Sequence, residues 1–127
     1  MPMRILFVDD VRDTRDLFRL AFGKQGHQIH LASNGVEAVA AVREQDFDAV
    51  VMDIEMPEMD GWDATREIRS LDRGRNLPII LFTAYSAQEN HQRASQAGAN
   101  TLLRKPMLPQ EVLSHIDRLK EQRDPGR

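Results

Sequence analysis

Short apolar runs alternate along the chain with longer segments in which apolar residues recur at helical spacing. The runs lie at residues 5–8, 29–32, 49–52, 79–82 and 102–103. Four of them are mainly apolar without alternation, which is typical of parallel strands buried on both faces, and the fifth is the shortest. Five strands that alternate with helices predict an α/β fold, in which helices cover both faces of a parallel sheet.

Spacing and end signals place the helices. The third is predicted over 60–71 and the fourth over 87–96, while Pro109 is a favoured first residue for the fifth. Ser33 or Asn34 is predicted to cap the second helix. The first two helices are traced by residues three and four apart: Leu17, Leu20, Ala21 and Lys24 in the first, and Val36, Val39, Ala40 and Arg43 in the second.

The fourth predicted helix has few apolar residues. They are Ala87 and Ala94, with Ala97 just beyond its end. Because burying an alanine removes little apolar surface from water, little holds this helix against the sheet. We therefore expect it to be the element that shifts most easily.

Length, composition and charge narrow the picture further. The 127 residues, 41% of them hydrophobic, fit one domain, which we place at residues 1–122 before a frayed polar tail at 123–127. A net charge of −3 argues against a nucleic-acid partner, because such proteins carry clustered basic residues. No apolar run is long enough for a membrane span or a signal peptide, so we expect a cytoplasmic protein without membrane association.

Polar side chains follow four of the apolar runs. Asp9 and Asp10 follow the first run, Asp53 the third, Thr83 the fourth and Lys105 the fifth. Because an open parallel sheet binds ligands at the carboxyl ends of its strands, these side chains are expected to converge. Three carboxylates so close together repel one another unless a hard cation such as Mg²⁺ lies among them.

The central carboxylate of this group has the chemistry of a nucleophile. Asp53 can attack phosphorus and form an acyl phosphate, with Asp9 and Asp10 on the metal side. Thr83 and Lys105 can then bind the phosphoryl oxygens, one as a hydroxyl donor and the other as a positive charge. The simpler alternatives are that Asp9 or Asp10 caps the next helix, and that Thr83 and Lys105 are a turn hydroxyl and a solvated charge.

With these residues the chain resembles the receiver domain of two-component response regulators, over nearly its whole length. The resemblance implies a flavodoxin-like, doubly wound sheet with strand order 2-1-3-4-5. The matching pieces are Val8-Asp9-Asp10, Asp53-Ile54-Glu55-Met56-Pro57-Glu58-Met59-Asp60-Gly61, Thr83-Ala84 and Lys105-Pro106.

The resemblance also implies a function for the site. Asp53 would take a phosphoryl group from a histidine kinase or a histidine phosphotransfer protein. Mg²⁺ would be held by Asp10 directly, by Asp9 through water, by Asp53 and by the backbone carbonyl of Glu55. Such a domain is not a dedicated enzyme, although it can slowly hydrolyse its own acyl phosphate.

Two further residues have roles that only the resemblance implies. Pro106 would follow a cis peptide bond that aims Lys105 into the site. Gly61 would permit close backbone approach after the phosphorylation site.

One position departs from the family pattern and bears on signal output. Many receivers carry Tyr or Phe three residues before the conserved lysine, and here that position is Leu102, which excludes an aromatic switch there. We therefore assign the conformational switch to Thr83, Tyr85 and Leu102. An equal alternative is that Tyr85 merely lines the rim of the site. The downstream protein is expected to contact the fourth helix, the fifth strand and the fifth helix.

Other classes of function fit less well. A phosphate-independent interaction module with this fold is the main alternative, and the complete acidic, hydroxyl and lysine set argues against it. A phosphatase of the haloacid dehalogenase type would carry its nucleophile after the first strand, and a flavodoxin would carry a phosphate loop there. A stand-alone regulator and a piece of a hybrid kinase both remain open, and Met1 directly before the first strand slightly favours the first.

Overall fold

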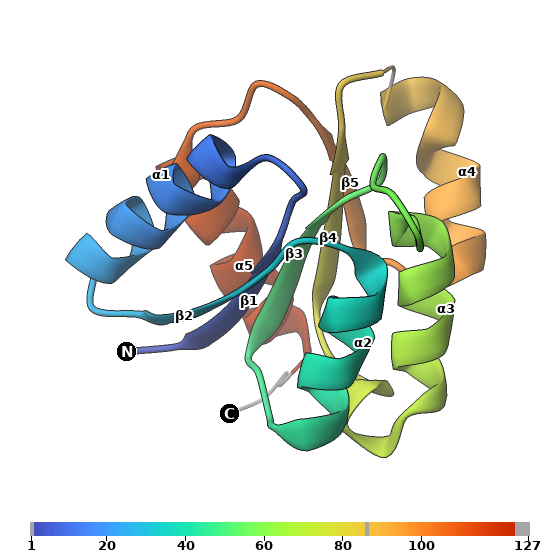
Figure 1. Ribbon diagram of the computed structural model, residues 1–127, viewed down its shortest axis with the longest axis horizontal. Coiled ribbons are helices and arrows are strands. Elements are labelled where there is room, and N and C mark those ends of the chain that lie inside the picture. The colour runs from blue at the N-terminus through green and yellow to red at the C-terminus, as the bar shows by residue number, and fades with distance from the viewer. Residues whose placement is uncertain (1, 86, 124–127) are drawn as a thin grey trace.

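Five parallel strands form one sheet in the order β2-β1-β3-β4-β5 (Figure 1), which confirms the predicted fold class and strand order. A computed structural model describes residues 2–85 and 87–123, so residues 124–127 of the predicted tail lie outside the described residues. The strands are β1 Arg4–Val8, β2 Gln28–Ala32, β3 Ala49–Asp53, β4 Ile79–Thr83 and β5 Thr101–Arg104. Each predicted run lies within one of them.

Helices cover both faces of the sheet, with α1 and α5 on one face and α2, α3 and α4 on the other (Figure 1). The predicted bounds of α3, 60–71, are nearly right. Asp60 is the N-cap and accepts a hydrogen bond from the Asp63 N–H at 2.9 Å. The helices are α1 Arg12–Lys24, α2 Gly35–Glu44, α3 Gly61–Ser70, α4 Ala87–Ala97 and α5 Pro109–Arg123, with a short 3₁₀ turn η1 at Asp72–Gly74.

The buried face of α1 differs from the predicted one. Leu17 and Leu20 are each 56% exposed, and Phe18 and Phe22 are buried instead. The Phe18 ring stacks on Phe7 of β1 with 4.4 Å between ring centroids. Since an aromatic ring buries more apolar area than a leucine side chain, the phenylalanine pair determines which side of the helix faces the sheet.

The face of α2 was also predicted wrongly in part. Val36 is 48% exposed, whereas Val39 and Val42 are buried. The helix starts against the loop before α3: the Gly35 N–H donates to the Met59 carbonyl, and a Cβ on Gly35 would lie 2.6 Å from that oxygen. This close approach fixes the rotation of α2. The predicted Asn34 cap is confirmed, because its side chain accepts from the Glu37 N–H.

β2 is the strand that departs from the prediction of burial on both faces. It lies at an edge of the sheet, and its exposure alternates, with Gln28 and His30 exposed. An edge strand has a neighbour on one side only, and here its second face is open to solvent. β3 and β4, the central strands, are buried along their whole length, as predicted.

One arginine joins the loops at the amino ends of β4 and β5. The Arg69 guanidinium of α3 donates to the carbonyls of Gly74, Leu77 and Gly98 at 2.6–2.8 Å. It also donates to the side-chain oxygen of Asn100 at 2.8 Å. One side chain, whose role was not predicted, therefore links the connection between α3 and β4 to the distant loop before β5.

We expect Arg69→Leu to lower the free energy of unfolding by about 3 kcal/mol, because several carbonyls lose a charged donor at once. Urea denaturation monitored by circular dichroism measures the change. Arg66→Leu is the matched control on the same helix, since Arg66 forms an exposed pair with Asp63 whose loss should cost about 0.5 kcal/mol or less. Equal effects of the two substitutions would contradict the role given to Arg69.

Candidate functional site

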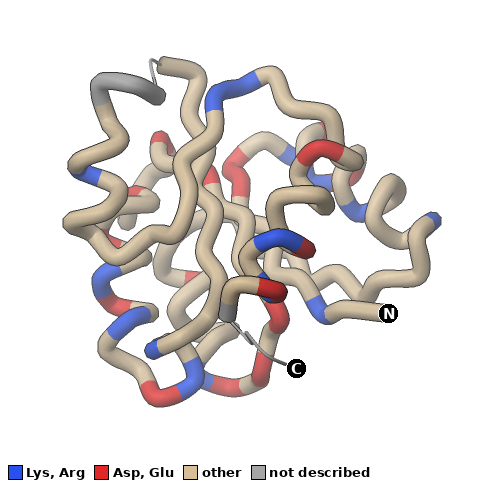
Figure 2. Tube along the Cα trace, turned by 180° about the vertical axis from the view of Figure 1, so that it is seen from behind, with Lys and Arg blue, Asp and Glu red and all other residues tan. Residues whose placement is uncertain are grey.

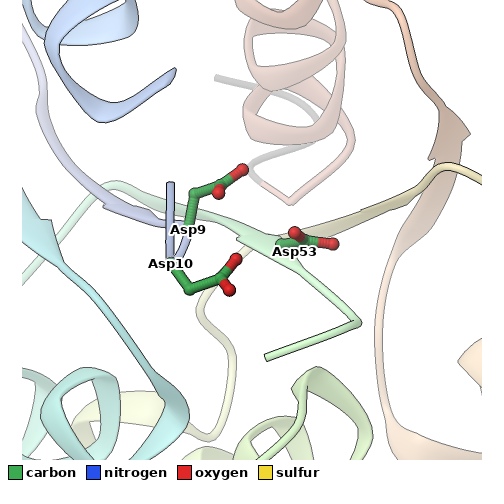
Figure 3. Close-up of side chains that lie close together, drawn as sticks. All are labelled: Asp9, Asp10 and Asp53. Carbon is green, nitrogen blue, oxygen red and sulfur yellow. The ribbon is translucent and has the colours of Figure 1, made fainter. Parts of the chain in front are cut away.

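The carboxyl ends of four strands bring the predicted polar residues to one edge of the sheet. Asp53 and Thr83 are the last residues of β3 and β4, and Lys105 directly follows β5. Asp9 and Asp10 follow β1. Parallel register makes these ends adjacent, since Val8 pairs with Met52 and Asp53 with Phe82. Figure 3 shows the three carboxylates gathered at the ends of β1 and β3.

The three carboxylates are close enough to share one cation. One oxygen from each of Asp9, Asp10 and Asp53 lies within 4.8 Å of the others, with Asp9 and Asp53 buried and Asp10 exposed. Short local hydrogen bonds orient the buried pair: Asp9 accepts from the Val11 N–H at 2.8 Å, and Asp53 from the Glu55 N–H at 3.2 Å. Oxygen ligands of this kind are those that Mg²⁺ prefers.

The alternative that an aspartate caps α1 is wrong. The N-cap residue of α1 is Val11, and no side chain caps the helix there. Asp9 accepts a hydrogen bond from Val11 itself, not from a residue inside the helix. The two aspartates therefore belong to the carboxylate cluster.

Lys105 lies between the two buried carboxylates. Its Nζ is 3.0 Å from Asp53 Oδ2 and 3.4 Å from Asp9 Oδ2. Its backbone N–H donates to the Thr83 carbonyl, and the Lys105–Pro106 peptide bond is cis, the geometry that the resemblance implies. The lysine thus meets two of the carboxylates at the strand ends, and its backbone is bonded to Thr83 at the end of the neighbouring strand.

Burial raises the pKa of Asp53 most strongly. The hydrogen bond and the charge of Lys105 lower it, while the negative charge of Asp9 raises it further, and the result is a pKa of about 6 against an ordinary 3.8. At neutral pH the carboxylate is therefore mostly ionised, as a nucleophile must be. It is nevertheless a better base than an exposed aspartate.

Two opposing effects act on the pKa of Lys105, and burial by itself would lower it. The hydrogen bond and the charge of Asp53, together with Asp9, outweigh burial, so the pKa of the ammonium lies above its usual value. The lysine is consequently a permanent positive charge at this edge of the sheet. An anion brought to Asp53 would meet that charge at short range.

Thr83 is fully buried, and its hydroxyl is engaged on both sides. Oγ1 accepts from the Tyr85 N–H at 3.0 Å and donates to the Glu55 carboxylate, with 3.0 Å to Oε2 and 3.2 Å to Oε1. The contact with the Glu55 side chain was not predicted. The only available signal was an acidic residue two positions past the end of β3, which does not by itself indicate which neighbouring strand the side chain reaches.

An open cleft of about 590 Å³ adjoins the carboxylates. Its walls include Asp10, Glu55 and Tyr85, and Tyr85 is 66% exposed at its rim. Its lining also includes Arg93 of α4, whose guanidinium lies 4.7 Å from the centroid of the Trp62 ring of α3. The cleft therefore connects the carboxylate cluster with α4.

Leu102, the third residue assigned to the switch, lies inside the molecule. It is buried in β5 and pairs in register with Leu81 of β4.

Gly61 packs against the strand that carries Asp53: a Cβ there would lie 2.6 Å from the Asp53 carbonyl oxygen. The expected close backbone approach at Gly61 is confirmed.

This fold and this site define a receiver domain. Residues 5–117 match the family model described as the response regulator receiver domain, so the chain belongs to that family, a class of two-component signalling domains.

The chain is similar to curated relatives of different lengths. The chain is 40% identical to an uncharacterized 14.6 kDa protein of Leptolyngbya boryana, covering 87% of this chain and 85% of the relative. It is 37% identical to the response regulator MprA of Mycobacterium sp. strain KMS over 98% of this chain, and it spans about half of that relative's length, 54%.

Solved receiver structures share the architecture. The receiver domain of the sensor histidine kinase PA1611 from Pseudomonas aeruginosa PAO1, which has a magnesium ion coordinated in its active site cleft, superposes with a TM-score of 0.85 at 34% identity, covering 94% of this chain and 98% of the other. The chemotaxis response regulator CheY4 of Vibrio cholerae gives 0.87 at 27% identity, covering 94% and 99%.

The raised pKa of Asp53 predicts a pH-dependent stability. The folded protein holds this proton more tightly than the unfolded chain, so the stabilisation is full below about pH 4 and is lost as pH rises through about 6. In buffer with a chelator, the wild type should therefore lose stability relative to Asp53→Asn between pH 4 and 7. Urea titrations across this range measure the difference, and a difference that is constant or moves the other way would contradict the assignment.

Proposed function

We propose that this receiver accepts a phosphoryl group on Asp53 from the phosphohistidine of a histidine kinase or a histidine phosphotransfer protein. The observation that carries the proposal is the short contact between Lys105 Nζ and Asp53 Oδ2 inside the buried carboxylate cluster. A carboxylate oxygen of Asp53 attacks phosphorus, and the bond from phosphorus to the donor imidazole nitrogen breaks. The imidazole leaves with that electron pair, and an acyl phosphate forms.

Two neighbours are suited to bind the transferred group. Lys105 carries a permanent positive charge beside the attacking oxygen, and Thr83 supplies a hydroxyl at the end of the adjacent strand. Lys105 already lies beside Asp53, and a charge held in place in this way stabilises developing negative charge. We infer that the domain also hydrolyses its acyl phosphate slowly, with water as the attacking nucleophile, and has no other catalytic activity.

A bound magnesium ion fits the same edge. Asp9, Asp10 and Asp53 supply oxygens close enough to share one cation, and the Glu55 backbone carbonyl is the fourth ligand that we propose. When bound, the ion supplies positive charge that offsets the repulsion between these carboxylates and a phosphoryl group. The PA1611 receiver, with its magnesium ion, supports this assignment.

The output surface that we propose comprises α4, β5 and α5, which are contacted by a downstream protein. α4 lies beside β5 at the edge of the sheet (Figure 1), and its described buried apolar side chains are Ala94 and Ala97. Such a helix shifts at low cost when Thr83 moves toward a phosphoryl group. The exposed Tyr85, at the start of the connection to α4, and the buried Leu102 lie on this route.

Nucleic acid and membrane are not partners in this proposal. Figure 2 shows basic and acidic residues interspersed along the chain instead of basic residues gathered on one face. Within residues 2–85 and 87–123, no helix is both long and apolar enough to cross a membrane.

Incubation with acetyl phosphate or phosphoramidate should add one phosphoryl group to the wild type, and only when Mg²⁺ is present. Intact-mass spectrometry measures the gain, and Asp53→Ala should gain none. Glu58→Gln, which removes an exposed charge from the loop after β3, is the control and should be labelled like the wild type. Labelling that persists in Asp53→Ala would refute the acceptor assignment, whereas an unlabelled wild type would favour a phosphate-independent module.

Beryllium fluoride, a phosphoryl analogue, should change hydrogen exchange most in the segment 85–96, of which residue 86 lies outside the described part. The reason is the weak apolar anchoring of α4, while α2 on the same face of the sheet is held by a larger buried set and should not respond. Exchange measured by mass spectrometry with and without the analogue tests this. Changes confined to the loops after β1 and β3 would exclude this output surface.

A further inference from the structure

The Glu55 side chain reaches away from the carboxylate cluster and binds the end of β4. Its Oε2 and Oε1 lie 3.0 and 3.2 Å from Thr83 Oγ1, which donates to them. Oε1 also lies 3.5 Å from the Ala84 backbone nitrogen, within reach of that N–H. Two successive donors at the end of β4 therefore point at one carboxylate.

The Thr83 hydroxyl and the Ala84 N–H lie at the end of β4, the strand next to the one that carries Asp53. Asp53 pairs in register with Phe82, so Thr83, the last residue of β4, and Ala84, just past its end, follow directly. A phosphoryl group on Asp53 carries anionic oxygens that need hydrogen-bond donors, and a carboxylate offers anionic oxygens of the same kind. Because a hydroxyl has one hydrogen, Thr83 cannot donate to both at once.

We propose that the Glu55 carboxylate is an internal competitor, which holds the Thr83 hydroxyl and the Ala84 N–H in the resting state and must leave before a phosphoryl group can use them. This inference rests on the proposed function, because it concerns the same acceptor site. Glu55 is then a positioning residue that raises the threshold for switching.

The exposure of the two partners makes the contact suitable for release. Thr83 is fully buried, whereas Glu55 is exposed. A carboxylate that remains close to water loses little solvation in the contact and can return to solvent at low cost. The Glu55 backbone stays in place meanwhile, because its N–H donates to Asp53 Oδ1.

Substitutions at Glu55 separate its reach from its charge. Glu55→Ala removes both, Glu55→Gln removes the charge but keeps an acceptor oxygen, and Glu55→Asp keeps the charge on a side chain one methylene shorter. Glu58→Gln is the matched control, since it removes one exposed negative charge from the same loop. Thr83→Val removes the hydroxyl donor.

The resting contact is tested without any phosphoryl analogue. In Glu55→Ala and Glu55→Asp, the Ala84 amide should exchange with solvent faster than in the wild type, by about tenfold in the first, while Glu58→Gln should match the wild type. Nuclear magnetic resonance measures this amide individually. Unchanged exchange at Ala84 in both Glu55 variants would overturn the proposal.

The competition itself is tested with beryllium fluoride and Mg²⁺, by isothermal titration calorimetry. Glu55→Ala and Glu55→Asp should bind the analogue about tenfold more tightly than the wild type, and Glu55→Gln by an intermediate factor. In a Thr83→Val background the gain from Glu55→Ala should shrink, as a double-mutant cycle would report.

The outcomes distinguish this proposal from the proposed function. If Glu55→Asp binds like the wild type, or Glu55→Ala binds no more tightly than Glu58→Gln, charge alone acts and the competitor is refuted. If neither the wild type nor any variant binds the analogue, the proposed function fails, and exchange at Ala84 alone then decides whether Glu55 holds these donors.

Discussion

The ion pairs of Lys105 with Asp53 and Asp9 are the interaction on which the site depends. Two buried carboxylates at one edge of a sheet would repel each other strongly, and one ammonium within 3.0 and 3.4 Å of them offsets that repulsion. The lysine is 96 residues from Asp9 in the chain, so the cluster exists only when the sheet is complete. The cluster of charged side chains therefore forms only as the protein folds.

The same edge also couples the chemistry to the rest of the molecule. Thr83 is bound by the Glu55 side chain, accepts from the Tyr85 N–H and belongs to the strand next to β5. A group that draws the hydroxyl toward Asp53 therefore acts on the start of the connection to α4. In the proposed response, the donors that change partners lie beside the connection to α4, a helix whose described buried apolar side chains are Ala94 and Ala97.

Most elements were predictable because their signals are local. Apolar spacing predicted the bounds of α3 nearly to the residue, and the first residue of α5 was predicted from Pro109. The buried sides of α1 and α2 were less predictable, because residue spacing alone allowed more than one side of each helix to face the sheet. Phe18 against Phe7, and Gly35 against Met59, are contacts between distant segments that decided between those sides.

The sequence by itself determined the order of strands and helices and which polar residues end the strands, because both follow from apolar runs and the residues directly after them. The order of the strands within the sheet was predicted only from the resemblance to a known family. Only the tertiary structure decided that Lys105 lies nearer to Asp53 than to Asp9, and that the Glu55 carboxylate turns toward Thr83. The physical reason is that side-chain direction and pKa depend on burial and on charges from other strands, which no single stretch of sequence contains.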